Sequence, residues 1–253
     1  KSAPSSFVAT GHFAGTSFSD GRYRLYKGAD PEKDQSYFLW MLTQEDLSRT
    51  VFPLGRLRKS EVRALARSFG VRAAEKKESQ EICFVPQDDY CSYLKNAIPG
   101  LGERVAGGEI VDGEERVIGK HQGYPFYTIG QRRGLGISAK EPLYVNALDP
   151  EHNRIHVGKK KSLETRKILV SGLNWIGIEK NLSPFHASAK IRYRDRETPC
   201  TVEPFPDGSA PVTFESPKNA VAAGQAAVFY RNDEVLGGGF IAGTVKENIS
   251  IIE

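Results

Sequence analysis

Short apolar segments recur from residue 167 to the C-terminus, at about the 8–12-residue spacing that is typical of small β-barrels and sandwiches. They lie at residues 168–175, 187–193, 200–204, 210–215, 226–230 and 235–241. A series of short strands can bury its apolar faces only if the sheet closes on itself or packs on a second layer. We therefore expect residues 167–253 to form a C-terminal β-barrel, with a small β-sandwich as the alternative.

The first 98 residues have a different pattern, in which strand-like and helix-like segments alternate. Residues 7–10 read as a short buried strand, and the Ser-Asp-Gly run at 19–21 is typical of a hairpin turn before a strand at 22–26. Ser60 is the expected N-cap of the clearest helical pattern. Helices are expected at residues 34–42, 43–47, 60–69 and 86–97, and sheet-edge strands at 71–73 and 82–85. This alternation predicts an α/β domain over residues 1–98.

Residues 99–166 form a third region, in which glycine pairs interrupt short strands and helical periodicity is absent. The segments 143–147 and 154–158 flank a polar turn and predict a hairpin. We expect a small β-rich central domain here, with boundaries near residues 98 and 166.

Positive charge is concentrated in the middle of the chain. The chain has a formal net charge of +4, whereas residues 120–167 alone carry ten basic and four acidic side chains. Arg132 and Arg133 lie in the glycine-rich stretch 130–136, which suits guanidinium contacts with a phosphate backbone. A solvated lysine-rich loop at residues 159–161 is the alternative explanation for part of this charge.

The cysteine and histidine content argues against disulfide and metal frameworks. Three cysteines are too few, and odd in number, and no Cys-x-x-Cys pair is present, so no metal site is expected. A reducing compartment fits best, the cytoplasm or alternatively an organellar matrix. No apolar run approaches the roughly 18 residues that a membrane span requires, so we expect no membrane partner.

Cys83 is the cysteine with the most informative surroundings. It follows Lys76 and Lys77 within a short polar run, and nearby cationic charge lowers the pKa of a thiol toward the reactive thiolate. The alternative is a buried structural cysteine, which is the more common fate of a free thiol. Local sequence alone leaves both interpretations open.

Several runs, in the same order along nearly the whole chain, resemble the tRNA-specific 2-thiouridylases, enzymes that place sulfur on the wobble uridine of tRNA. The runs lie at residues 9–12, 33–39, 52–55, 76–84, 128–136, 189–193, 199–200, 224–230 and 236–239. Each run alone is weak evidence, and their combination is specific. The resemblance implies an α/β domain of the ATP-pyrophosphatase type, which contains a parallel sheet.

The resemblance also implies a chemistry. ATP, with Mg²⁺, would adenylate the C2 oxygen of uridine, and a persulfide carried on Cys83 would displace AMP. Gly11 would contact ATP through its backbone. A sulfur-donor protein, a cysteine desulfurase or a sulfur-relay protein, is the implied partner besides tRNA, and we expect a monomer.

The same resemblance implies a set of tRNA contacts. His12, Lys33, Asp34 and Gln35 would contact tRNA from the α/β domain. The C-terminal barrel would contribute Arg192, Tyr193 and Gln225, with Arg192 and Tyr193 expected on a strand. Arg132 and Arg133 join this list because of the basic central region.

The sequence departs from the family in one respect. The Ser-Gly-Gly-Val-Asp-Ser phosphate loop of the family and its second catalytic cysteine are absent, so the Mg²⁺ ligands are expected outside this chain. We expect a fragment that does not turn over alone. Two alternatives remain, a non-catalytic tRNA-binding module and a small-molecule ATP pyrophosphatase. Cys83 argues against the first, and the basic region with its barrel argues against the second.

Overall fold

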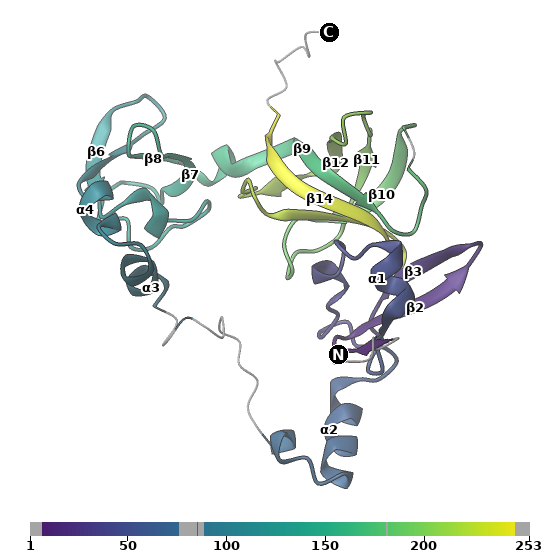
Figure 1. The fold of residues 1–253 in the computed structure, drawn as a ribbon. Coiled ribbons are helices and arrows are strands. Elements are labelled where there is room, and N and C mark those ends of the chain that lie inside the picture. Colours follow the sequence, from purple (N-terminus) through teal and green to yellow (C-terminus); the bar gives the residue numbers. More distant parts are fainter. Residues whose placement is uncertain (1–6, 76–84, 86–88, 181, 246–253) are drawn as a thin grey trace. The chain divides into compact units, whose positions relative to one another are not determined.

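A computed structural model describes residues 7–75, 85, 89–180 and 182–245 of the 253-residue chain (Figure 1). The chain divides into two compact units. One comprises residues 1–76, 166–217 and 222–253, and the other comprises residues 77–165 and 218–221. The N-terminal segment thus belongs to the same unit as the C-terminal strands. The expected division into three domains, with boundaries near residues 98 and 166, stays a prediction.

The first unit is built around a closed six-stranded barrel, as the strand spacing predicted. Its strands are β9 (Glu164–Trp175), β10 (Phe185–Lys190), β11 (Thr198–Val202), β12 (Ala210–Asn219), β13 (Ala226–Arg231) and β14 (Glu234–Thr244). The order β13-β10-β11-β12-β9-β14 closes because β13 also pairs with β14. Fully buried side chains such as Val202, Phe214 and Phe229 fill it.

A hairpin from the N-terminal segment extends this sheet. Strands β2 (Ala14–Ser19) and β3 (Arg22–Lys27) are antiparallel, and Asp20 and Gly21 adopt positive φ angles at their turn, as the sequence predicted. β3 pairs with β14 at Leu25 and Tyr26. Residues from the two ends of the chain therefore share one sheet.

The α/β character of the N-terminal segment is also confirmed. Strand β1 (Val8–Ala9) pairs in parallel with β4 (Thr50–Val51), which directly follows helix α1 (Gln44–Arg49). The prediction that the first strand is buried was wrong, because Val8 is 58% exposed. Among the described residues β1 has β4 as its only strand partner, so most of its surface is uncovered.

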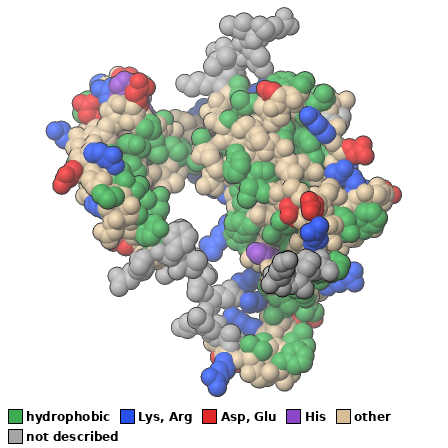
Figure 2. Space-filling view, viewed as in Figure 1, with side chains coloured by type: hydrophobic (Ala, Val, Ile, Leu, Met, Phe, Trp, Pro, Cys, Tyr) green, Lys and Arg blue, Asp and Glu red, His purple; other side chains and the backbone are tan. Residues whose placement is uncertain are grey.

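Helix α2 (Lys59–Ser68) forms where the apolar periodicity predicted it, with a different cap. Arg58, not Ser60, is the N-cap, because its backbone N–H donates to the Glu61 carboxylate. Leu65 and Phe69 on its apolar face are exposed, and Figure 2 shows hydrophobic surface over the α2 segment at the lower end of the view. The next segment is the short 3₁₀ helix η2 (Arg72–Glu75), so the strand predicted at residues 71–73 was wrong.

The helix predicted at residues 34–42 was also wrong, because only the 3₁₀ turn η1 (Ser36–Phe38) forms there. Asp34 accepts hydrogen bonds from the backbone N–H groups of Gly28 and Ser36. Side-chain bonds of this kind compete with the helical hydrogen-bond pattern. The aromatic residues that follow then pack against the barrel instead of forming one helical face.

Trp40 packs against Gly238 of β14, and this contact joins the N-terminal segment to the barrel. A Cβ atom on Gly238 would lie 2.9 Å from the carbonyl oxygen of Ala227 and 3.0 Å from the Trp40 ring. The Asn174 side chain donates a 2.7 Å hydrogen bond to the Trp40 carbonyl. Trp40 is buried in a core cluster that both parts of the chain share, with members including Leu25, Tyr37, Leu47, Val228, Tyr230 and Val235.

The second unit is a small β-rich body, as expected of the central region. Its sheet has the order β6-β5-β8-β7, from β5 (Gly108–Val111), β6 (Val117–His121), β7 (Tyr144–Asp149) and β8 (Arg154–Gly158). The predicted hairpin is β7–β8. The unit also holds α3 (Tyr90–Ala97), α4 (Leu101–Val105), η4 (Tyr124–Phe126) and η5 (Lys160–Leu163). The sequence had predicted no helix after residue 99, so α4 is a correction.

A buried histidine lies between two loops of this unit. Gly123 N–H donates to Nδ1 of His121, so the ring proton lies on Nε2 and donates to the Asn153 carbonyl. Burial lowers the pKa of His121, and the hydrogen bond to Asn153 partly opposes that shift. Within the described part of the chain, no helix has both the length and the apolar character to cross a membrane.

The contact between Gly238 and Trp40 predicts a specific stability defect. Gly238→Ala forces the Trp40 ring or the β13 backbone to move, and overpacking of this kind costs on the order of 1–3 kcal/mol. Gly243→Ala in the same strand is the matched control, since an added Cβ would meet nothing within 4 Å there. Urea unfolding of both variants measures the difference. Equal stabilities would contradict the packing account.

Candidate functional site

The predicted sulfur site cannot be placed, because Cys83 and both preceding lysines lie outside the described residues. The two remaining cysteines are free thiols. Cys200 is 2% exposed within β11, and Cys91 is half-buried in α3. Burial of this kind is typical of structural cysteines.

Gly11 and His12 follow β1 at the end of the parallel strand pair. Ligands of open α/β sheets bind at the carboxyl ends of strands, so this is the expected edge for a nucleotide. Gly11 is exposed, and a Cβ there would meet only Leu54, at an ordinary contact distance of 3.7 Å. The His12 ring is fixed by a 2.8 Å hydrogen bond between its Nδ1 and the Thr10 hydroxyl.

Gln35 brings the 33–35 run next to His12. Its backbone N–H donates to the Phe13 carbonyl at 2.9 Å, and its side-chain Oε1 accepts from the Phe13 N–H at 3.0 Å. These two hydrogen bonds with Phe13 hold Gln35 beside the backbone segment that contains His12. Lys33 lies half-exposed two residues before it.

Asp34 is buried, and the structure gives its carboxylate an internal role. Besides the two backbone bonds, one oxygen accepts from the Ser36 hydroxyl at 3.0 Å, and the Lys190 ammonium lies 3.8 Å from the same oxygen. Asp34 therefore organises the 33–38 segment against β10. Direct contact of this carboxylate with tRNA finds no support in this geometry.

Further charges surround the Asp34 carboxylate at the junction between hairpin and barrel. The Lys27 ammonium pairs with Glu197 at 2.8 Å and lies 4.9 Å from the centre of the Tyr230 ring. The Tyr230 hydroxyl approaches Ser36 Oγ at 3.4 Å, and burial raises the pKa of Tyr230 well above its usual range. Charged groups that are buried or partly buried are stable only when they are paired with an opposite charge.

Arg192 and Tyr193 lie in a turn between β10 and β11, so their placement on a strand was wrong. Asp195 makes the turn, because its N–H donates to the Arg192 carbonyl and its carboxylate accepts from the Ile191 N–H. Arg192 is exposed and Tyr193 half-buried. A turn presents both side chains more openly than a barrel strand would.

Tyr37 links the predicted tRNA-contacting segments to one another. Its hydroxyl donates to the Ala226 carbonyl at 2.9 Å, next to the exposed Gln225, and its ring centre lies 6.4 Å from that of Tyr193. Burial, aided by the charge of Asp195 and opposed by that of Arg192, raises the pKa of Tyr37 to about 12. The 33–39 segment, the 192–193 turn and the turn before β13 therefore meet on one unit.

The sequence interpretation missed Tyr37 and its exposed neighbour Phe38 as site residues. Aromatic residues at positions 37, 38 and 40 do not share one face of a helix, which was a signal against the predicted helix. That pattern fits a turn that directs successive rings to different sides.

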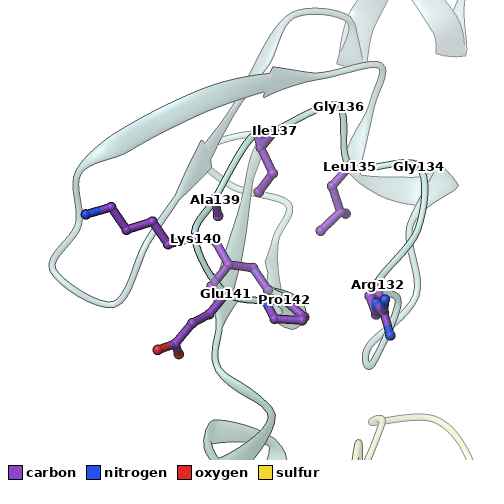
Figure 3. Close-up of a pocket in the computed structure, with 10 residues that line it drawn as sticks. Arg132, Gly134, Leu135, Gly136, Ile137, Ala139, Lys140, Glu141 and Pro142 are labelled. Atoms are coloured by element: carbon purple, nitrogen blue, oxygen red, sulfur yellow. The ribbon is translucent and has the colours of Figure 1, made fainter.

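Arg132 and Arg133 belong to the other unit, where both are exposed in the 130–143 loop. The loop lines an open pocket of about 410 Å³. Leu135 and Ile137 point into this pocket, whereas Lys140 points away from it (Figure 3). Part of the basic excess is neutralised locally, since Arg154 pairs with Glu109. Among the described residues, no group of three or more His, Cys, Asp or Glu side chains is placed to hold a metal ion.

Three family models match the chain in succession. The model of the tRNA methyl transferase HUP domain matches residues 1–87, that of the tRNA methyl transferase PRC-barrel domain matches residues 96–159, and that of the aminomethyltransferase beta-barrel domain matches residues 165–241. Together they follow the order of an α/β segment, a β-rich centre and a barrel.

Three curated relatives carry the name tRNA-specific 2-thiouridylase MnmA. The protein of Chlorobium phaeobacteroides (strain DSM 266) is 67% identical over 240 residues, which cover 95% of this chain and 67% of that protein. Those of Chlorobaculum tepidum and Geotalea uraniireducens are 67% and 47% identical over 93% and 96% of this chain, and over 64% of each relative. The chain thus spans about two-thirds of the length of these relatives.

The internal role of Asp34 generates a prediction. Asp34→Ala removes the acceptor for three hydrogen bonds and leaves Lys190 without this counter-charge, which should destabilise the chain by on the order of 2–4 kcal/mol. Gln225→Ala, at an exposed side chain, should change stability by less than about 0.5 kcal/mol. Thermal unfolding measures both variants. A stable Asp34→Ala chain with strongly reduced tRNA affinity would instead identify Asp34 as a direct contact.

Proposed function

The chain belongs to the tRNA-specific 2-thiouridylase family, and we propose on that premise that it acts in the 2-thiolation of the wobble uridine of tRNA. The observation that carries this proposal is the contact of Tyr37, in the 33–39 segment, with the Tyr193 ring and the Ala226 carbonyl. Arg192 and Gln225 are the residues directly before these two contact points in the sequence. These segments lie far apart in the sequence and were each expected to contact tRNA. One surface that combines guanidinium, aromatic and amide groups suits an RNA with unpaired bases.

In the proposed reaction Cys83 carries the sulfur. The C2 oxygen of the uridine attacks the α-phosphorus of ATP, which forms the adenylate and releases pyrophosphate. The terminal sulfur of a Cys83 persulfide then attacks C2. A carbon–sulfur bond forms, the carbon–oxygen bond breaks, and AMP leaves with the former C2 oxygen. A second thiol then attacks Cys83, forms a disulfide with it and releases the thiolated base. A thiol reductant must then supply two electrons to open this disulfide, and a sulfur-donor protein must transfer the outer sulfur of its own persulfide to the freed Cys83 thiolate.

The second thiol is expected from outside this chain. Cys200 is buried within the barrel sheet, and Cys91 is half-buried in α3. By the family resemblance, neither corresponds to the second catalytic cysteine. The scheme therefore assigns the sulfur-carrying role to Cys83.

The residues near Gly11 fit one part of ATP. The exposed backbone at Gly11 leaves room for a close approach by an adenosine group. Triphosphates need several convergent N–H donors, usually from a glycine-rich loop or a helix N-terminus. The 237–239 glycines instead pack against Trp40, Val170 and Asn174, and the 130–136 glycines belong to the other unit. We propose that a segment outside this chain supplies the phosphate loop and the Mg²⁺ ligands.

Cys83→Ser tests the sulfur-carrier role, in a protein supplemented with the segment that completes the nucleotide site. We expect loss of 2-thiouridine formation with nearly unchanged tRNA affinity, because serine keeps the size of the side chain and removes the thiolate. Quantification of 2-thiouridine by mass spectrometry and a parallel binding assay provide the readouts.

Cys91→Ser is the matched control and should retain full activity. Activity of Cys83→Ser above a few per cent of the unmodified protein would end the assignment. Equal loss in both variants would point to damaged folding rather than lost chemistry.

Arg132 and Arg133 provide a test of the polyanion footprint. Neutralising both should flatten the slope of log affinity for tRNA against log salt by about one unit for each phosphate that is no longer neutralised. Arg116→Gln with Arg154→Gln is the matched control from the same unit, since each of those arginines already pairs with a carboxylate. Equal slopes for both double variants would place the phosphate contacts elsewhere, with Arg192 the next candidate.

A further inference from the structure

Phe38 is an exposed aromatic residue between two buried neighbours. Its side chain is 51% exposed, whereas Tyr37 and Leu39 are 5% and 9% exposed. The 3₁₀ turn at residues 36–38 directs Tyr37 into the shared core and Phe38 outward. The exposure of this ring is therefore imposed by a backbone that its neighbours fix.

The Phe38 ring is held in place by two other aromatic rings. Its centre lies 4.5 Å from that of Tyr193, with an angle of 35° between the rings, and 5.5 Å from that of Tyr37 at 82°. Tyr37 is itself anchored to the Ala226 carbonyl. An isolated exposed apolar side chain on a protein surface needs no explanation. A ring that contacts two aromatic neighbours, one of them anchored by a hydrogen bond, is a different feature.

The chemistry around this aromatic pair suits a nucleobase. Arg192 precedes Tyr193 in the same exposed turn, and Gln225 is exposed next to the residue that anchors Tyr37. Bases stack on aromatic side chains regardless of sequence, and a nearby guanidinium and amide can contact phosphate and base edges.

We propose that Phe38 and Tyr193 form a stacking platform for an unpaired nucleobase of the bound tRNA. The inference rests on the proposed function and adds Phe38 as a residue that positions the substrate. The platform is composite, because Phe38 belongs to the N-terminal segment and Tyr193 to the barrel. A base stacked there would contact both parts at once.

Substitution of Phe38 tests the platform in the full 253-residue chain, with unmodified tRNA as the probe. Phe38→Leu keeps an apolar side chain and removes the aromatic face. We expect affinity to fall roughly 5- to 150-fold, the range found when stacked aromatic residues are truncated. Phe38→Trp should restore affinity. Because base stacking on an uncharged ring releases no counterions, the salt slope should stay unchanged in Phe38→Leu.

Phe69→Leu is the matched control, because Phe69 is also exposed, at 78%, on the same unit. It should leave tRNA affinity unchanged, and thermal midpoints of all variants should agree. The added indole of Phe38→Trp provides a second readout. tRNA should quench the tryptophan fluorescence of Phe38→Trp more than it quenches that of the unmodified chain. Fully paired RNA of equal length should cause no such additional quenching.

The outcomes separate the two proposals. Tight tRNA binding by the unmodified chain with unchanged affinity in Phe38→Leu would overturn the platform alone. Weakened binding that Phe38→Trp does not restore would also overturn it, since a stacking role requires an aromatic ring and not phenylalanine itself. Absence of tRNA binding by the unmodified chain would overturn the proposed function together with the platform.

Discussion

Strand β14 joins the two ends of the chain, and the geometry of the candidate site depends on that junction. β14 pairs with β9 and β13 within the barrel and with β3 of the N-terminal hairpin. Where its glycines leave room, Trp40 packs against the strand backbone. A larger residue at Gly238 would force the Trp40 ring or the β13 backbone to move, and Trp40 belongs to the same segment as Tyr37 and Phe38. The relative placement of the 33–39 segment and the 192–193 turn follows from this close packing.

A paired charge network gives the same junction its specificity. Asp34, Lys190, Lys27 and Glu197 surround the Tyr230 ring, and each charge has an opposite partner within 4.0 Å. Such networks add little net stability, because desolvation offsets much of the attraction between the charges. They do penalise alternative arrangements strongly, since a shifted segment would leave a charge unpaired. We therefore infer that the network sets the orientation of the N-terminal segment, while the apolar core supplies most of its stability.

The sequence correctly predicted secondary-structure elements that depend on local signals. Its predictions were wrong where contacts between distant residues determine the local structure. The six barrel strands and the β2–β3 hairpin follow from strand spacing and the Asp20-Gly21 turn. The helix predicted at residues 34–42 did not form, because Asp34 and Gln35 bond to distant backbone groups that no local pattern reveals. No sequence pattern predicted the shared core, because it joins residues nearly 200 positions apart, as in the contact of Ser36 with Tyr230.

The sequence predicted which residues belong to the candidate site, but not how they are arranged in space. Resemblance to the family named Lys33, Gln35, Arg192, Tyr193 and Gln225, whereas only the structure identified Tyr37 as the residue that connects them. Asp195 explains why the prediction of Arg192 on a strand was wrong. Its carboxylate accepts a hydrogen bond from the Ile191 N–H, which forms a turn and ends the strand before Arg192. The role predicted for Cys83 remains a prediction outside the described residues.

Hydrogen-exchange mass spectrometry of the chain with and without tRNA tests the central claim, that the separate segments form one tRNA-binding face. The account predicts that tRNA protects peptides covering residues 33–38, 192–195 and 223–226 together, at the same tRNA concentration. Joint protection with one apparent affinity is the signature of a single surface. Protection confined to the 130–143 loop, or protection of the three peptides at clearly different tRNA concentrations, would contradict it.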